Sequence, residues 1–159
     1  ADPMETLYEN LNFSISPWED FFDLLLALVL GALLGWEREV RNKPAGLRTF
    51  MLVSVGSAAY MLIATNLIAS VEDPALRLDP TRIMQGIIGG LGFIGGGAIL
   101  QTRGSVKGMT TAAAIWVAGA IGMACGLSMH GLALMIGLFA FLVMKVLLFA
   151  EKRINPDQK

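Results

Sequence analysis

Residues 108–144 read GMTTAAAIWVAGAIGMACGLSMHGLALMIGLFAFLVM, a run of 37 positions without Asp, Glu, Lys or Arg. A bilayer core of about 30 Å is crossed by roughly 20 helical residues. As a single helix this run would be about 55 Å long at 1.5 Å per residue. The run therefore predicts two membrane-spanning helices. We expect the break at the polar, glycine-flanked segment 126–131, which gives spans of about 109–126 and 131–150.

Three further spans are predicted upstream of this run. Residues 49–71 and 83–102 are uncharged over 23 and 20 positions. The first span has only 13 uncharged residues, 24–36, but Ser16-Pro17-Trp18-Glu19 resembles a helix start with a capping box. We expect this helix to continue in water to Lys43, because Pro44 disfavours helix in the residue before it. The fold class predicted is an all-α integral membrane protein with five transmembrane helices.

The composition supports lipid as the solvent. Of 159 residues, 55% are hydrophobic and 16% are charged, against about 25% charged in an average domain. A single Cys and a net charge of −1 exclude a disulfide-stapled secreted domain and a basic nucleic-acid binder. We divide the chain into an N-terminal tail 1–16, in which 1–3 resembles a cloning remnant, a transmembrane domain 17–150 and a C-terminal tail 151–159.

The basic residues predict the orientation. Lys and Arg are enriched in the cytoplasmic loops of membrane proteins. With the N-terminus outside and the C-terminus inside, ten of the twelve Lys and Arg residues lie on the inner side. The reverse orientation would place ten outside. We therefore predict a multi-pass membrane protein with N-out, C-in topology.

Small residues predict where the helices meet, because helices in lipid associate through small side chains. The glycines of 86–97 predict that the third span is a Gly-rich central helix. The alternatives are close packing alone, or a backbone that bends and exposes carbonyls to an ion. The expected packing or partner face comprises Gly31, Gly35, Gly89, Gly90, Gly92, Gly96 and Gly122.

An outer polar cluster is predicted around Asp23, which lies one turn inside the first span on its small-residue face. An ionisable group there is a functional candidate. The alternative is an interfacial acid that complements the helix dipole. Arg82 is the expected partner of Asp23, and Asn66 and Gln85 should lie near the same end.

A second, inner cluster is predicted at the opposite membrane boundary. Its members are polar residues that border the spans on the basic side: Glu37, Arg38, Arg48, Thr49, Arg103, Lys107, Thr110 and Thr111. Glu37 with Arg41, and Glu39 with Lys43, have the i,i+4 spacing of a solvated helix extension. Binding of anionic lipid headgroups would also explain Arg103 and Lys107.

No catalytic, metal or cofactor site is predicted, so we expect a protein that is not an enzyme. Residues 90–95 match GxGxxG, but they lie inside a hydrophobic span and lack the preceding strand and following acid of a dinucleotide site. His130 stands alone in an outer turn and is a poor metal ligand candidate. Cys125 is single and forms no internal disulfide.

Four motifs in order resemble the MgtC/SapB family of bacterial membrane proteins. They are Gly35-Trp-Glu37-Arg38-Glu39, Lys43-Pro-Ala-Gly46-Leu47-Arg48-Thr49, Arg82-Ile-Met-Gln85 with the glycines that follow at 89–97, and Val106-Lys-Gly108-Met-Thr110-Thr111 with Trp116. The resemblance covers roughly residues 20–126. It implies a five-helix, N-out domain in the inner (plasma) membrane of a bacterium.

The resemblance also implies a role in stress physiology: growth at low magnesium, acid survival and persistence inside host cells. Some members are thought to bind the membrane sector of ATP synthase and restrain it. Many members carry a C-terminal cytosolic domain similar to the ACT fold. Nine residues follow Ala150 here, so we expect this domain either to be absent from the protein or to have been removed from it.

Three functional hypotheses follow. The first is a non-enzymatic regulator that contacts another membrane protein. The second is a proton or Mg²⁺ channel or transporter, or a transport accessory, although the four later spans contain no Asp or Glu. The third is a lipid-handling or structural protein of the bilayer that forms a homo-oligomer through its glycine faces.

Overall fold

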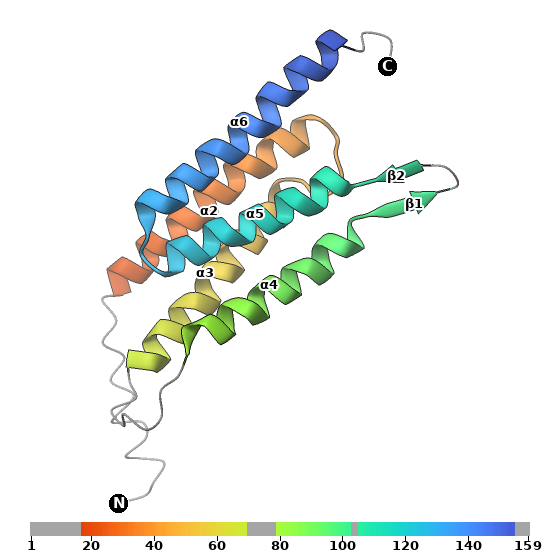
Figure 1. Ribbon diagram of the computed structural model, residues 1–159. Coiled ribbons are helices and arrows are strands. Elements are labelled where there is room, and N and C mark those ends of the chain that lie inside the picture. Colours follow the sequence, from red (N-terminus) through yellow and green to blue (C-terminus); the bar gives the residue numbers. More distant parts are fainter. Residues whose placement is uncertain (1–16, 70–78, 103–104, 155–159) are drawn as a thin grey trace, which may run out of the picture.

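The computed structural model describes residues 17–69, 79–102 and 105–154 and contains five helices in this part of the chain. They are α2 (Pro17–Val40), α3 (Leu47–Ala69), α4 (Pro80–Gly97), α5 (Met109–Gly126) and α6 (His130–Ile154). Figure 1 shows that successive helices run in opposite directions. The all-helical fold with five helices is confirmed. The predicted N-cap at Ser16 lies outside the described residues.

The first helix ends earlier than predicted. Continuation to Lys43 is wrong, because α2 ends at Val40. Asn42 has a φ of 51°, and the amides of Asn42 and Lys43 donate to the carbonyls of Glu39 and Arg38 at 3.0 and 3.1 Å. This is the hydrogen-bond pattern of a Schellman motif, in which a left-handed residue closes the helix. Asn tolerates that conformation better than most residues.

The predicted break in the long apolar run is confirmed, since α5 ends at Gly126 and α6 begins at His130. A second Schellman motif makes the turn. Ser128 has a φ of 56°, its amide donates to the Cys125 carbonyl at 2.8 Å, and the Met129 amide donates to the Ala124 carbonyl at 2.9 Å. The left-handed residue is therefore a serine, although glycine stands at 126 and 131.

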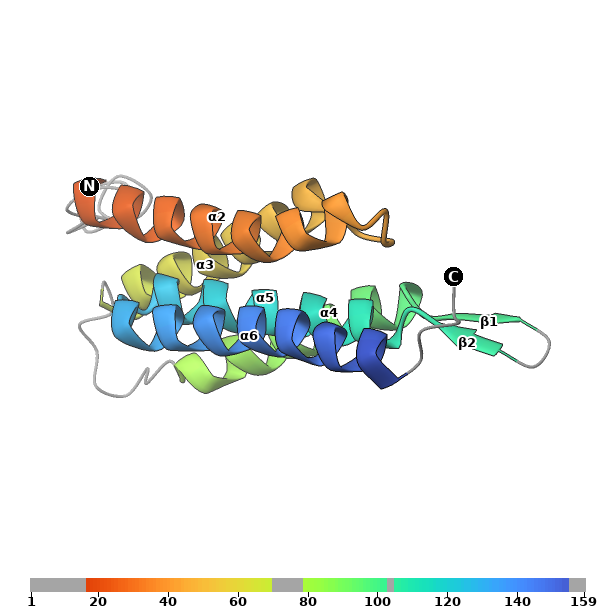
Figure 2. The same ribbon diagram turned by 90° about the horizontal axis from the view of Figure 1, so that it is seen from above.

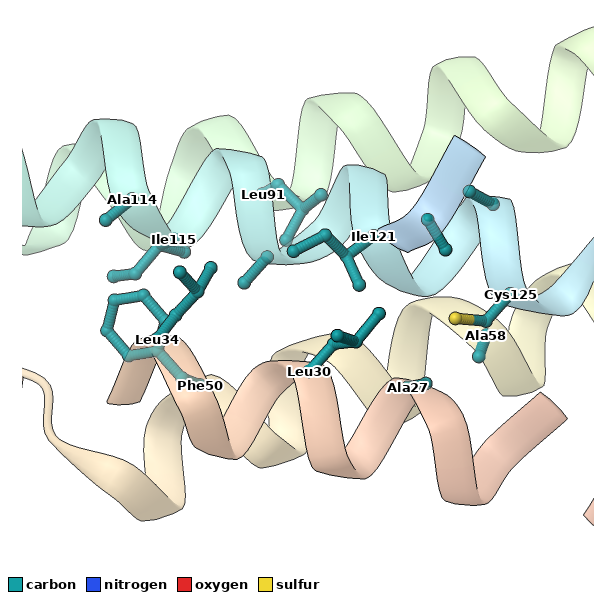
Figure 3. Close-up of a cluster of buried hydrophobic side chains, with 13 residues drawn as sticks. Ala27, Leu30, Leu34, Phe50, Ala58, Leu91, Ala114, Ile115, Ile121 and Cys125 are labelled. Atoms are coloured by element: carbon teal, nitrogen blue, oxygen red, sulfur yellow. The ribbon is translucent and has the colours of Figure 1, made fainter. Parts of the chain in front are cut away.

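The helix at the centre of the bundle is α5, which packs against each of the other four helices. Figure 2 shows α2 and α3 on one side of it and α4 and α6 on the other. The core is formed by side chains such as Leu34, Phe50, Ile115 and Ile121, which point into the space between α5 and the α2–α3 pair (Figure 3). The prediction that the glycine-rich helix is central is wrong, because α4 lies at the edge and most of its residues are exposed.

Close approach of the inner helices depends on glycines of α2 and α5. A methyl group on Gly31 would lie 2.8 Å from the Phe50 carbonyl oxygen, and one on Gly122 would lie 2.1 Å from the Ser54 carbonyl oxygen. Both distances are shorter than any van der Waals contact. Small residues at these crossings thus let α2 and α5 pack directly against the backbone of α3. Of the glycines expected on a packing or partner face, Gly31, Gly35 and Gly122 lie at these crossings.

A helix cap precedes α4 and a β hairpin follows it. At its start, Asp79 caps the helix by accepting hydrogen bonds from the Thr81 amide at 2.9 Å and hydroxyl at 2.7 Å. These hydrogen bonds lower the pKa of the Asp79 carboxyl. After the helix, β1 (Leu100–Thr102) and β2 (Ser105–Lys107) form an antiparallel hairpin in which Gln101 pairs with Val106. The hairpin is not predicted from the sequence, because β1 falls within the uncharged run 83–102 that was expected to be a membrane span.

By length and composition, two of the described helices are long and apolar enough to cross a membrane, namely α3 and α5. The apolar part of α6, His130–Lys145, is shorter. The predicted number of five crossings and the N-out, C-in orientation remain predictions.

Candidate functional site

Two buried polar clusters join α2 to the rest of the bundle, one at each end. We call the end with the α2–α3 connection and the β hairpin the basic end, because Arg38, Arg41, Lys43 and Arg48 lie there. The opposite end, where α2 begins and α5 turns into α6, is called the turn end (Figure 1). A buried charge is costly unless it is paired, so each cluster must be explained by its partners.

At the basic end, Arg38 on α2 reaches α5. Its Nη2 donates a hydrogen bond to Thr111 Oγ1 at 2.5 Å, and the two residues are 6% and 1% exposed. The structure thus brings together two residues of the predicted inner cluster, although no pairing between them was predicted. It places a positive charge at the contact between the first helix and the central helix.

Glu37 is buried beside this contact. One of its carboxylate oxygens lies 2.5 Å from Arg41 Nε, an ion pair of the predicted i,i+4 type. By hydrogen-bond geometry, however, neither carboxylate oxygen of Glu37 has a partner in the described structure, and the same is true of Arg38 Nε. The Glu37–Arg41 ion pair is thus defined by the short distance between its charged groups and not by a well-aligned hydrogen bond. Both Glu37 oxygens can still accept a hydrogen bond, and Arg38 Nε can still donate one.

Glu39 has a different role from the one its spacing predicted. Its Oε2 accepts a hydrogen bond from the Leu47 amide at 3.0 Å, so it caps the start of α3 instead of pairing with Lys43. An acid at a helix N-terminus is favoured by the helix dipole. A methyl group on Gly46 would lie 1.8 Å from the same carboxylate oxygen, so glycine leaves room for this contact.

At the turn end, Asp23 is 2% exposed and is bound by two side chains of the α5–α6 turn. The Ser128 hydroxyl donates to its Oδ2 at 2.9 Å, and His130 Nε2 contacts its Oδ1. The prediction that Arg82 is the partner of Asp23 is wrong. The interpretation of His130 as an isolated residue is wrong as well, because the left-handed Ser128 turns the chain back toward α2.

The remaining predicted site residues do not gather around these clusters. Asn66 is half-buried on α3, and Arg82 and Gln85 are exposed at the start of α4. At the basic end Thr49 is half-buried, whereas Arg48, Lys107 and Thr110 are exposed. Arg103 lies outside the described residues.

The glycines of α4 form an open surface. A methyl group on Gly89, Gly90, Gly92 or Gly96 would have no atom of another described helix within 4 Å. Gly95 is the exception, because it faces the Ala112 carbonyl oxygen of α5 at 3.3 Å. These four positions were predicted to form a packing or partner face, and within the described chain nothing packs on them.

The described residues contain no group of three or more His, Cys, Asp or Glu side chains that could hold a metal ion. They form a helical bundle in which buried polar side chains make contacts between helices. Two of the helices are candidate membrane spans, and the glycine surface of α4 is open. These features define an all-helical bundle with two candidate membrane spans and an open glycine surface on α4.

Comparison with known proteins assigns the family. The model of the MgtC family matches residues 24–153, so the chain belongs to the MgtC family. It is 41% identical over 124 residues to a protein of Escherichia coli K12 named "Putative magnesium transporter YhiD". It is 38% identical over 133 residues to Protein MgtC of Salmonella typhimurium and 34% identical over 152 residues to Protein SapB of Bacillus subtilis.

These relatives are longer than the chain. The matches cover 77%, 84% and 93% of this chain but 58%, 54% and 64% of YhiD, MgtC and SapB. The chain thus spans between about half and two thirds of each relative. No solved structure matches it.

Proposed function

We propose that this protein is a non-enzymatic, multi-pass component of the bacterial inner membrane that acts by contact between α4 and a helix of another membrane protein. The observation that supports the proposal is the open glycine surface of α4. Gly89, Gly92 and Gly96 are exposed, with no atom near enough to touch an added methyl group.

The spacing of the residues on this surface supports a helical partner. Arg82, Gln85, Gly89, Gly92 and Gly96 follow one another at alternating steps of three and four, which is the period of a helix–helix seam. All five are exposed, on the side away from Leu91 and Gly95, which are buried. In lipid, exposed Gln and Arg side chains favour polar contacts with another helix over contacts with acyl chains.

The physiological role that we propose is the one implied by the family resemblance. We propose a stress function at low magnesium, in acid or during survival in host cells, with the membrane sector of ATP synthase as the partner implied by the resemblance. A second copy of the chain is the other partner we consider, since a homo-oligomer could use the same seam. Five crossings and an N-out, C-in orientation belong to this proposal.

The test is crosslinking in native membranes followed by purification. Replacing Gly92 or Gly96 with Leu should remove the crosslinked partner, because the larger side chain keeps the helix backbones apart. Gly131→Leu is the matched control, because that glycine is equally open but lies on α6. Detection of ATP synthase membrane subunits, or of the chain itself, identifies the partner. Equal partner yield from Gly92→Leu and Gly131→Leu would overturn the proposal.

Ion transport is the second candidate function, and the two buried carboxylates favour it. Asp23 and Glu37 are both buried on α2, about 21 Å apart along the helix at 1.5 Å per residue. Between them the buried side of α2 is closed by Ala27, Leu30 and Leu34, which leaves no polar path for a hydrated Mg²⁺ ion in this conformation.

Ion flux into proteoliposomes, compared between the parent chain and Asp23→Asn, tests this second candidate function. Background flux in both would remove this candidate.

A further inference from the structure

A groove of about 640 Å³ runs between α3 and α4. Its lining is almost entirely apolar: Leu52, Val53, Gly56, Ser57 and Tyr60 from α3, and Ile83, Gly86, Ile87, Gly90, Leu91 and Ile94 from α4. The three glycines in this lining have no neighbouring atom within 4 Å of an added methyl group. The groove is therefore open space beside the bundle, on a different face of α4 from Gly89, Gly92 and Gly96.

The length of the groove matches one leaflet of a bilayer. From Leu52 to Tyr60 the α3 wall extends about 12 Å, and from Ile83 to Ile94 the α4 wall extends about 16 Å, at 1.5 Å per residue. Half of a hydrocarbon core of about 30 Å is about 15 Å. An extended acyl chain of a single leaflet thus fits along the groove from end to end.

A cation lies in line with the groove at the basic end. Arg48, Leu52, Gly56 and Tyr60 follow one another at steps of four and share one face of α3. Arg48 is exposed and forms no ion pair with any residue in the described part of the chain. One helical turn beyond the apolar lining is the depth at which a phospholipid carries its phosphate, and Arg binds phosphate oxygens well.

We propose that this groove binds one acyl chain of an anionic phospholipid and that Arg48 binds its phosphate group. The inference rests on the membrane location in the proposed function but not on the contact made by α4. The apolar walls take the acyl chain, and the guanidinium selects a headgroup with net negative charge, such as that of phosphatidylglycerol.

The size of the groove favours an acyl chain over a partner helix. A helix 10–12 Å in diameter and about 16 Å long would occupy roughly 1,300–1,800 Å³, which exceeds the 1150 Å³ of atom-free space that the groove and its open mouth enclose. Since α3 and α4 contact each other and both line the groove, the groove lies at their junction. A flexible hydrocarbon chain fills such a space more completely than a rigid helix.

The experiment is native mass spectrometry of the detergent-purified chain with equal amounts of phosphatidylglycerol and phosphatidylcholine added. The parent chain should retain about one phospholipid and prefer phosphatidylglycerol. Gly90→Leu, which fills the groove, should lower retention several-fold. Gly92→Leu is the control and should retain lipid like the parent, since Gly92 does not line the groove. Arg48→Gln should keep a bound lipid but lose the preference for phosphatidylglycerol.

Both glycine variants should fold, because each new side chain enters open space; circular dichroism and the thermal midpoint verify this. Equal lipid retention by Gly90→Leu and Gly92→Leu would overturn the proposal. A mass of two chains that disappears in Gly90→Leu would also overturn it, by identifying a second copy in the groove. The crosslinking result for Gly92→Leu tests only the proposed partner contact of α4, whereas lipid retention by Gly90→Leu tests only the lipid groove. Either proposal can therefore be overturned while the other stands.

Discussion

Arg38 of α2 donates a hydrogen bond to Thr111 of α5 across 73 positions of sequence, with 2.5 Å between Nη2 and Oγ1 and both residues buried. The guanidinium carries its charge at the junction of the first and the central helix, beside the Glu37–Arg41 ion pair. Thr111 thus gives a hydrogen-bond acceptor to one of the few buried charges in the described part of the bundle, and its hydroxyl adds a polar contact to the apolar packing between α2 and α5.

Replacing Thr111 with Val tests this polar contact. The change leaves a buried Arg38 donor without an acceptor, which costs about 1–3 kcal/mol in proteins generally, whereas hydrogen bonds between membrane helices average about 0.6 kcal/mol. We expect a loss of about 1 kcal/mol and a lower thermal midpoint in detergent. Thr110→Val is the control, because Thr110 is exposed and adjacent. The same loss in both variants would contradict a specific role of Thr111.

The buried carboxylate at the turn end gives a second prediction. Asp23→Ala removes the acceptor of the Ser128 hydroxyl and the contact with His130, and should destabilise the bundle by about 1–2 kcal/mol. The stability of Asp23→Asn should lie between those of the parent chain and Asp23→Ala, since an amide oxygen still accepts a hydrogen bond from the Ser128 hydroxyl. Hydrogen exchange of residues 127–130 should accelerate in the same order. Asp20→Ala, one turn earlier and more exposed, should change exchange in this turn little; an equal effect would contradict the assignment.

The sequence predicted the helices better than their arrangement. The end of α5 at Gly126 followed from the length of an uncharged run compared with the thickness of a bilayer. The position of α4 did not follow from its glycines. Glycines permit close approach but do not say to which helix, and Gly122 of α5 is buried against α3 whereas Gly92 of α4 touches nothing.

The partner of Asp23 could not be chosen from charge alone. Arg82 was expected because it is the cation nearest the same end in sequence, whereas the structure uses Ser128 and His130. Their position depends on the left-handed conformation of Ser128, and serine gives little signal for that conformation. At the basic end, by contrast, the i,i+4 spacing was enough to predict the Glu37–Arg41 pair.

The cap of α4 predicts a local dependence on pH. Hydrogen bonds from Thr81 lower the pKa of the Asp79 carboxyl in the folded state. The capping contribution is therefore present above the ordinary Asp pKa of about 3.9 and is lost as the pH falls through the lower, folded value. Amide exchange of Thr81, corrected for its intrinsic pH dependence, should show less protection at low pH. Asn also caps helices but does not titrate, so Asp79→Asn should remove this dependence; its persistence would assign the effect to another group.

The contrast between packed and open glycines gives the final prediction. In Gly122→Ala the new methyl group would lie 2.1 Å from the Ser54 carbonyl oxygen, and backbone cannot move aside as a flexible side chain can. Overpacking of this kind costs about 1–3 kcal/mol, so the thermal midpoint should fall. Gly92→Ala adds the same methyl group in open space on α4, where alanine is favoured over glycine by about 1 kcal/mol through helix propensity. The two variants should therefore shift the midpoint in opposite directions. A fall of similar size in Gly92→Ala would show that α4 is packed against another helix in the purified protein.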